Sequence, residues 1–181
     1  MENNDGWVNV FNGYPPPPLP PPPPPPPVLN LIQQDEYRAN AASSIYVSGL
    51  PSVQFLVNGG MGIRVVDALA QDYRGLDDPD AKLLEGMKNK VNVRIMIPGY
   101  ASYTKPKYVR TTADCITRGM LATRVAEVVR DFVSSNCPRG PDGTPYLVVG
   151  DVSLRLDELI LLAVEHVSKG SVQPVLAYLT V

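Results

Sequence analysis

A run of prolines near the N-terminus has the residue types and spacing that proline-binding domains recognise. Residues 15–27 contain twelve prolines, interrupted only by Leu19. Because proline fixes φ and lacks a backbone N–H, this segment is expected to form a polyproline II rod about 40 Å long, at about 3.1 Å per residue. A rod that is already extended loses little conformational entropy when it docks. The candidate partner-binding residues are Tyr14, Pro15, Pro16, Pro17, Pro18, Leu19, Pro20 and Pro21.

The order of residues within the run indicates which partners it suits. The sequence PPLP at 17–20 resembles a WW-domain ligand, and the eight prolines after Leu19 resemble the ligands of profilins, with EVH1-like domains as a further match. An SH3 domain fits less well because no arginine or lysine flanks the run closely. The sequence therefore predicts a non-enzymatic interaction or adaptor protein that presents a polyproline ligand. The alternative for this segment is an inert spacer.

A second candidate is the segment 100–112, which is expected to be a basic loop rich in tyrosine. Aromatic rings stack on bases and cations contact phosphates in proteins that bind single-stranded nucleic acid. The whole chain has a net charge of −2, so the attraction for a polyanion must come from this segment alone. Nucleic-acid or anionic-ligand binding is thus the first alternative function of the chain. The purely structural interpretation of this segment is that its tyrosines pack on the sheet. The candidate residues are Tyr100, Tyr103, Lys105, Lys107, Tyr108 and Arg110.

A third candidate is the glycine-rich turn NGGMG at 58–62, which lies between an expected strand and an expected helix. Backbone amides and the helix dipole hold phosphates in such a layout. The candidate phosphate-binding residues are Gly60, Gly62 and Arg64, but Val65 stands where the dinucleotide fingerprint needs a third small residue. Nucleotide binding is therefore the second alternative, and a plain glycine turn is the structural one.

Catalytic and metal chemistry are not predicted. The single histidine, His166, lies in an apolar segment near the C-terminus and is expected to be structural. Cys115 and Cys137 have neither CxxC spacing nor a histidine nearby, and the acids at 77–80 suit the first turn of a helix better than a cation. We therefore expect a protein that is not an enzyme and that has no metal and no cofactor.

The clearest strand and the clearest helix flank the basic segment. Apolar residues alternate with mostly polar ones over 91–97, which predicts a strand that ends at Pro98 and Gly99. From Thr117 onward an apolar stripe at spacings of three and four predicts an amphipathic helix. The stripe contains Leu121, Val125, Val128, Val129 and Phe132.

The other expected elements are shorter. Strands at 45–47 and 53–57 are expected to form a hairpin, and helical spacing over 63–73 predicts the first helix. Asp78 followed by Pro79 predicts the start of a second, short helix that ends before Val91.

Strands are also expected towards the C-terminus. A four-residue strand is predicted at 146–149, and segments 159–167 and 172–181 are predicted to form a hairpin. Pro174 indicates that the last of these strands lies at a sheet edge.

These elements mix strands and helices without a regular βα repeat, which predicts an α+β fold. We expect a single domain, residues 44–181, with a mixed, largely antiparallel sheet packed by two or three helices. A flexible terminus at 1–14, the rod at 15–27 and a linker at 28–43 form a disordered, proline-rich arm before it. The N-terminus does not resemble a signal peptide and no apolar run is long enough to cross a membrane, so a cytoplasmic or nuclear location is expected. A second copy of the chain is a further candidate partner.

The order of several segments also resembles a known group of proteins. The sequence IPGY at 97–100 is followed by a basic segment, by ITRGMLATRVAEVVRDFV at 116–133 and by LDELILLAVEHVSKGSVQPVL at 156–176. This order resembles uncharacterised proteins of mushroom-forming fungi over residues 62–179. The resemblance implies one folded domain and no catalytic residue.

Overall fold

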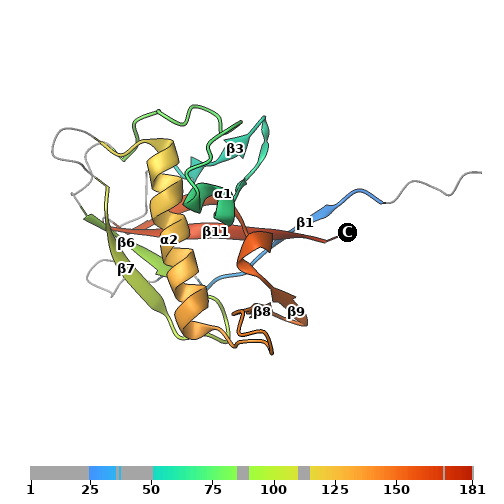
Figure 1. Cartoon of the computed structure of the whole chain (residues 1–181). Coiled ribbons are helices and arrows are strands. Elements are labelled where there is room, and N and C mark those ends of the chain that lie inside the picture. The colour runs from blue at the N-terminus through green and yellow to red at the C-terminus, as the bar shows by residue number, and fades with distance from the viewer. Residues whose placement is uncertain are drawn as a thin grey trace, which may run out of the picture.

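The computed structural model of the chain describes residues 25–35, 37, 51–84, 90–109, 115–168 and 170–180. A long helix, α2, lies across one face of a twisted main sheet, and a short helix, α1, packs beside it (Figure 1). The expected α+β fold with a largely antiparallel sheet is confirmed, with two α-helices in the described part of the chain.

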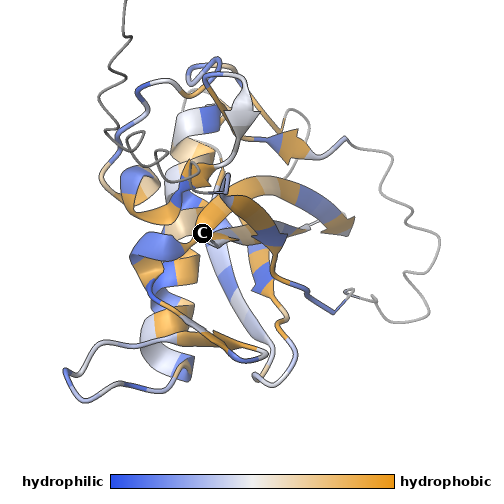
Figure 2. Ribbon diagram, turned by 90° about the vertical axis from the view of Figure 1, so that its right-hand side faces the viewer, coloured by the Kyte–Doolittle hydropathy of each residue, from blue (hydrophilic) through white to orange (hydrophobic). Residues whose placement is uncertain are grey.

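The main sheet has the strand order β2-β10-β11-β6-β7, and β5 and β1 add to β10 and β11 respectively. All its pairings are antiparallel except that between β6 and β11. The long strands are largely hydrophobic, whereas α2 has one hydrophilic side (Figure 2). The strands of this sheet are β1 (Val28–Leu31), β2 (Val53–Gln54), β5 (Ile63–Arg64), β6 (Lys90–Ile95), β7 (Tyr103–Tyr108), β10 (Ile160–Ser168) and β11 (Ser171–Thr180).

Strand β6 and helix α2 (Arg118–Asn136) form the centre of the core, as the two clearest sequence patterns predicted. Thr117 caps the helix, since its side chain accepts a hydrogen bond from the Met120 amide at 3.4 Å. Alternate residues of β6 face the helix, so both apolar patterns are buried in one cluster. Its members include Val91, Val93, Ile95, Leu121, Val125, Val128, Val129 and Phe132.

The predicted C-terminal hairpin is confirmed, but the expected edge position of its last strand is wrong. Strand β11 lies inside the sheet, with β10 on one side and β6 and β1 on the other. Pro174 is tolerated there because it falls between the part of β11 that pairs with β6 and the part that pairs with β1. The side-chain amide of Gln34 donates to the Pro174 carbonyl at 2.5 Å in that gap. Neither β6 nor β1 therefore needs a hydrogen bond from the N–H that Pro174 lacks.

The expected linker after the proline run is wrong over its first residues. Val28–Leu31 is strand β1, which pairs in register with the last four residues of β11. Ile32 is buried in the main core, so the folded unit includes residues well before position 44. Residues 38–50, with the strand expected at 45–47, lie outside the described residues.

Two expected helices between 63 and 90 are also corrected. Helix α1 covers only Val65–Leu69, because Ile63 and Arg64 pair with β10 instead. The segment that follows Asp78 forms turns and one isolated bridge, between Lys82 and Thr117, up to residue 84. Residues 85–89 lie outside the described residues.

Two small hairpins flank the main sheet. Strands β3 (Leu56–Val57) and β4 (Gly60–Met61) pair through the glycine-rich turn. The predicted strand near 146–149 is confirmed as β8 (Leu147–Val149), and it pairs with β9 (Val152–Leu154), which was not predicted. A short 3₁₀ helix, η2 (Leu156–Glu158), leads from β9 into β10. Much of the segment expected to be a basic loop is strand β7, which is a further correction.

Candidate functional site

The proline run is attached to the domain without an intervening linker. Its last three residues, Pro25, Pro26 and Pro27, are exposed and lead directly into β1. In Figure 1, β1 and residues 25–27 before it project from the body of the domain. The candidate residues Tyr14, Pro15, Pro16, Pro17, Pro18, Leu19, Pro20 and Pro21 lie outside the described residues.

The segment after the prolines is held by hydrogen bonds to two strands. The Ile32 amide donates to the Leu176 carbonyl at 2.8 Å, and the Gln34 side chain bonds the Pro174 carbonyl. The same Gln34 side chain accepts a hydrogen bond from the Met96 amide at 3.1 Å, so it connects β11 to the end of β6. The base of the proline run is thereby fixed. The sequence analysis missed this anchor, although the short apolar run VLNLI, in which only Asn30 is polar, was its signal.

The tyrosines and lysines of the basic segment are divided between the two faces of the sheet. Tyr103, Lys105 and Lys107 alternate along β7 on the face covered by α2. Tyr108 falls on the opposite face, where it is 63% exposed and carries the Lys90 ammonium 4.5 Å from its ring centre. A single base-stacking surface is not assembled from these residues, and Arg110 lies outside the described residues.

Two of these tyrosines are packing residues. The rings of Tyr100 and Tyr103 lie 5.5 and 5.6 Å from the Phe132 ring of α2. The Tyr100 hydroxyl also accepts a hydrogen bond from the Val148 amide at 2.8 Å, and burial raises the pKa of this phenol. Tyr100 and Tyr103 therefore connect β7, α2 and β8. This agrees with the alternative in which the tyrosines of this segment pack within the fold.

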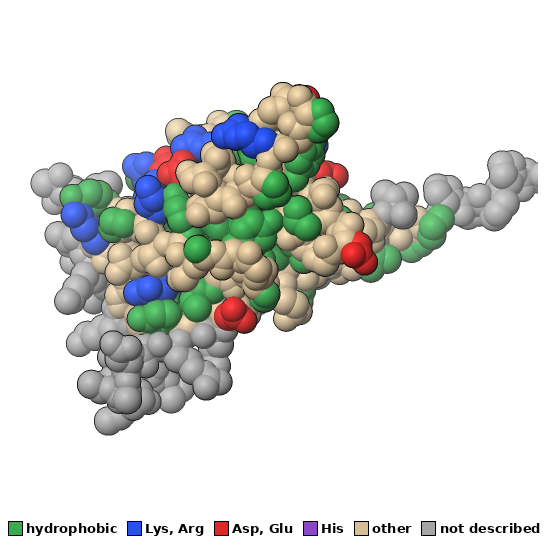
Figure 3. Space-filling model, turned by 90° about the horizontal axis from the view of Figure 1, so that it is seen from below, with side chains coloured by type: hydrophobic (Ala, Val, Ile, Leu, Met, Phe, Trp, Pro, Cys, Tyr) green, Lys and Arg blue, Asp and Glu red, His purple; other side chains and the backbone are tan. Residues whose placement is uncertain are grey.

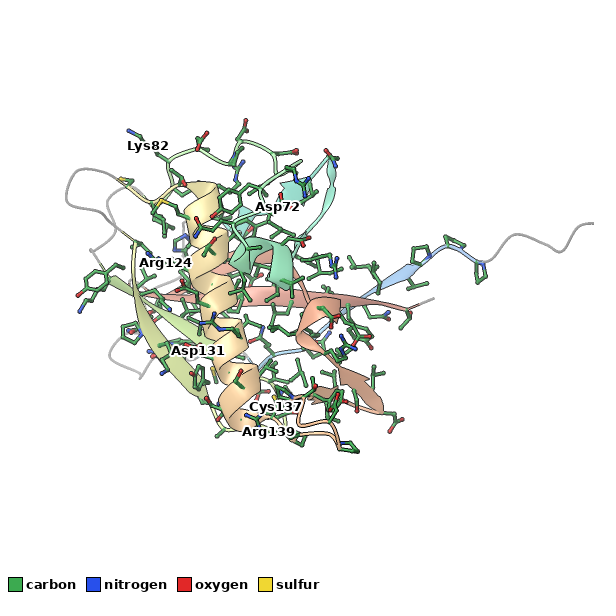
Figure 4. The ribbon with its side chains drawn as sticks, in the orientation of Figure 1. Asp72, Lys82, Arg124, Asp131, Cys137 and Arg139 are labelled. Carbon is green, nitrogen blue, oxygen red and sulfur yellow. The ribbon has the colours of Figure 1, made fainter. Side chains whose placement is uncertain are left out.

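The lysines of β7 have local partners of their own. The Lys107 ammonium lies 2.7 Å from the Glu127 carboxylate, which Arg124 also contacts at 3.1 Å. Figure 4 shows Arg124 and Asp131 projecting from α2, so both signs of charge occur on this helix. Lys105 lies 5.6 Å from the centre of the Tyr103 ring. The local field at β7 is therefore partly neutralised.

The glycine-rich turn closes a hairpin. Asn58 and Gly59 have φ angles of 52° and 73°, which suits the tight turn between β3 and β4. The Gly62 amide donates to the Phe55 carbonyl at 2.8 Å, and the Val65 amide at the start of α1 donates to the Leu159 carbonyl at 2.9 Å. These two amides are engaged within the fold rather than turned towards a phosphate.

A hollow of about 480 Å³ lies beside this turn, lined by charges of both signs. Arg74 forms a bidentate pair with Asp72, and it holds the pKa of that carboxyl at about 2. The third candidate, Arg64, donates to the Asp157 carbonyl at 3.0 Å, and Asp67 also lines the hollow. Gly60, Gly62 and Arg64 are thus near one another, but acidic side chains accompany the cations.

The single histidine lies on the core face of β10. His166 pairs with Val172, is 8% exposed and has no hydrogen-bond partner at Nδ1. Burial lowers the pKa of this imidazole. The position fits the structural role that the sequence predicted.

His166 should make stability depend on pH. As pH falls through about 6.5, the unfolded chain takes up a proton before the folded one, so the free energy of unfolding should decrease, by at most about 1.4 kcal/mol per pH unit. Urea unfolding between pH 8 and 5.5 should show a steeper loss for the parent than for His166→Gln. Parallel pH profiles for the two proteins would contradict this.

Among the described residues, no group of three His, Cys, Asp or Glu side chains is placed to hold a metal ion. No helix in the described ranges is long and apolar enough to cross a membrane. The expected absence of an enzymatic activity and of a cofactor stays a prediction. Comparison with known protein families, curated proteins and solved structures finds no match for this chain, so its resemblance to the fungal proteins also stays a prediction.

Proposed function

We propose that this chain is a non-enzymatic interaction protein that presents a polyproline ligand to a proline-binding partner. The observation that supports this most directly is the junction between prolines and domain. Pro25–27 are exposed, and the next residue begins a strand that is bonded to the sheet. The α+β domain acts in this proposal as a rigid base.

The physical advantage lies in the entropy of docking. A polyproline II rod is already extended, so it loses little conformational freedom when aromatic side chains grip it. A base fixed by β1 limits how far the rod reorients relative to the domain. Repeated prolines also offer several overlapping registers, which favours rebinding.

One substitution distinguishes WW-domain binding from profilin binding. The full chain is titrated against a purified profilin, a WW domain and an EVH1 domain. If the PPLP sequence is the ligand, Leu19→Ala should weaken WW binding by about tenfold, which corresponds to about 1.4 kcal/mol. Profilin binding to the eight prolines after it should change by less than about twofold.

Val148→Ala is the matched control, since Val148 is an apolar surface residue of β8 far from the prolines in sequence. It should leave all three affinities unchanged. Failure of all three domains to bind the full chain would remove the support for this proposal.

No contact in the described part of the chain favours the nucleic-acid or nucleotide alternatives over this one. Both stay hypotheses for residues 100–112 and for the turn at 58–64.

A further inference from the structure

Strand β1 has one backbone side that is open with respect to the described residues. It pairs with β11 on one side, and no strand in the described ranges pairs with its other side. The Ile32 amide donates to the Leu176 carbonyl of β11. The backbone groups of Asn30 and Val28, two and four residues before Ile32, therefore also point towards β11. The backbone groups of Leu29 and Leu31 must then point to the open side. This side offers two donors and two acceptors.

Two edge strands of the main sheet, β7 and β1, differ in protection. Strand β7 contains Lys105, Pro106 and Lys107, which are the residue types that discourage edge pairing. Strand β1 has the sequence VLNL and no charged residue. Nothing on this strand repels another strand, and a second copy would place no like charges opposite one another.

The open edge also carries exposed apolar side chains. Val28, Leu31 and Leu179 are 58%, 54% and 51% exposed. Leu29 lies opposite Leu179, so Leu29, Leu31 and Leu179 occupy one face of the β1–β11 ribbon. Figure 3 shows hydrophobic side chains along the arm that leads from the body. Such a cluster on a projecting edge is typical of an interface.

The remaining N-terminal segment of the same chain is poorly placed to cover this edge. The only apolar stretch before the prolines is at residues 7–11. The proline run at 15–27, for which the sequence predicts a rod, separates it from β1 along the chain. Prolines 25–27 have no N–H to donate to a ladder, so they cannot extend the pairing themselves.

We propose that β1 pairs with β1 of a second copy of this chain, antiparallel and about a two-fold axis at Asn30. In this register Leu29 faces Leu31 of the second copy, and each pair exchanges two backbone hydrogen bonds. Pairing ends at Pro27, which has no N–H. The two sheets become continuous and the apolar residues of both edges meet.

This dimer directs the two proline rods in opposite directions from a shared ribbon. A partner with two binding sites is then held through both rods, which raises its apparent affinity. The dimer itself does not depend on the proposed function, because its assembly is measured without any proline-binding partner.

The register is tested by cysteine cross-linking of the full chain. Across the axis, Asn30 of the two copies forms a non-hydrogen-bonded pair with Cα atoms about 4.5 Å apart, within the disulfide range of about 4.4–6.8 Å. Asn30→Cys should therefore give a covalent dimer on mild oxidation. Val28 of the two copies would lie about 14 Å apart, at about 3.4 Å per residue over four residues, so Val28→Cys should not. The parent controls for the native cysteines. Cross-linking of Val28→Cys alone, or of neither variant, would overturn the proposal.

The assembly itself is tested by sedimentation over a range of concentrations. The parent should approach twice its 19.7 kDa mass, and Leu31→Lys should remain at 19.7 kDa, because a buried ammonium opposes pairing. Tyr108→Lys, on the exposed face of β7, is the matched control and should assemble as the parent does. A monomeric parent at all concentrations, or equal assembly of Leu31→Lys, would overturn the proposal. Loss of assembly on deletion of residues 1–14 would identify that segment as the occupant and would also overturn it.

Discussion

Replacing Gly62 by alanine is expected to lower the free energy of unfolding by about 2–5 kcal/mol. Gly62 has a φ of +86°, and a Cβ added there would lie 2.3 Å from Ile160 Cγ2 and 2.7 Å from Leu162 Cδ2. The left-handed backbone costs a side chain about 1–2 kcal/mol, and overpacking adds about 1–3 kcal/mol. Denaturant unfolding followed by circular dichroism measures the change.

Gly59→Ala is the matched control for the space around Gly62. Gly59 has a similar φ of +73°, but nothing lies within 4 Å of its added Cβ. It should therefore cost only the backbone part, about 1–2 kcal/mol. Equal losses for the two variants would contradict the packing explanation. A rise in the melting temperature of the parent with ATP or NAD would instead support a nucleotide site at this turn.

Local sequence patterns predicted the elements that bury a single face or a single stripe. Strand β6 buries one face and α2 buries one stripe, so their periods appear directly in the sequence. The β10–β11 hairpin is joined by a short connection, so its pairing is also local. The fold class follows from these elements together with their mixed order.

Pairings between distant segments were not predictable in the same way. The partner of β1 lies about 150 residues away in sequence, and no local pattern names it. Pro106 and two lysines made β7 resemble a loop, although these residue types are common on edge strands. Pro174 indicated an edge strand. The sequence cannot show that the strand beside β11 is β6 before this residue and β1 after it.

The candidate sites, too, could be predicted where they depend on local sequence and not where they depend on how distant segments pack. The proline run is identified by composition alone, and its last residues are exposed as a ligand requires. The tyrosines and lysines looked like one surface because they are close in sequence, but strand alternation sends Lys107 and Tyr108 to opposite faces. The glycine turn resembled a phosphate loop, yet Gly62 is needed for close packing against β10.

Replacing residues 15–27 by glycine and serine at the same length should abolish binding of a proline-binding domain. Flexible residues keep the spacing but lose both the rod and the ring contacts, so affinity should fall by at least about a hundredfold. The domain should remain folded, because Pro25–27 are exposed and the core lies after Val28. Its melting temperature should change by less than about 2 °C.

The most direct measurement is therefore a calorimetric titration of the parent and this replacement with whichever of the profilin, WW and EVH1 domains binds the parent, with thermal melts of both proteins. The account predicts lost binding with an unchanged melt. Retained binding would show that the prolines are only a spacer, and a lost melt would show that they are part of the fold; either result would contradict the account.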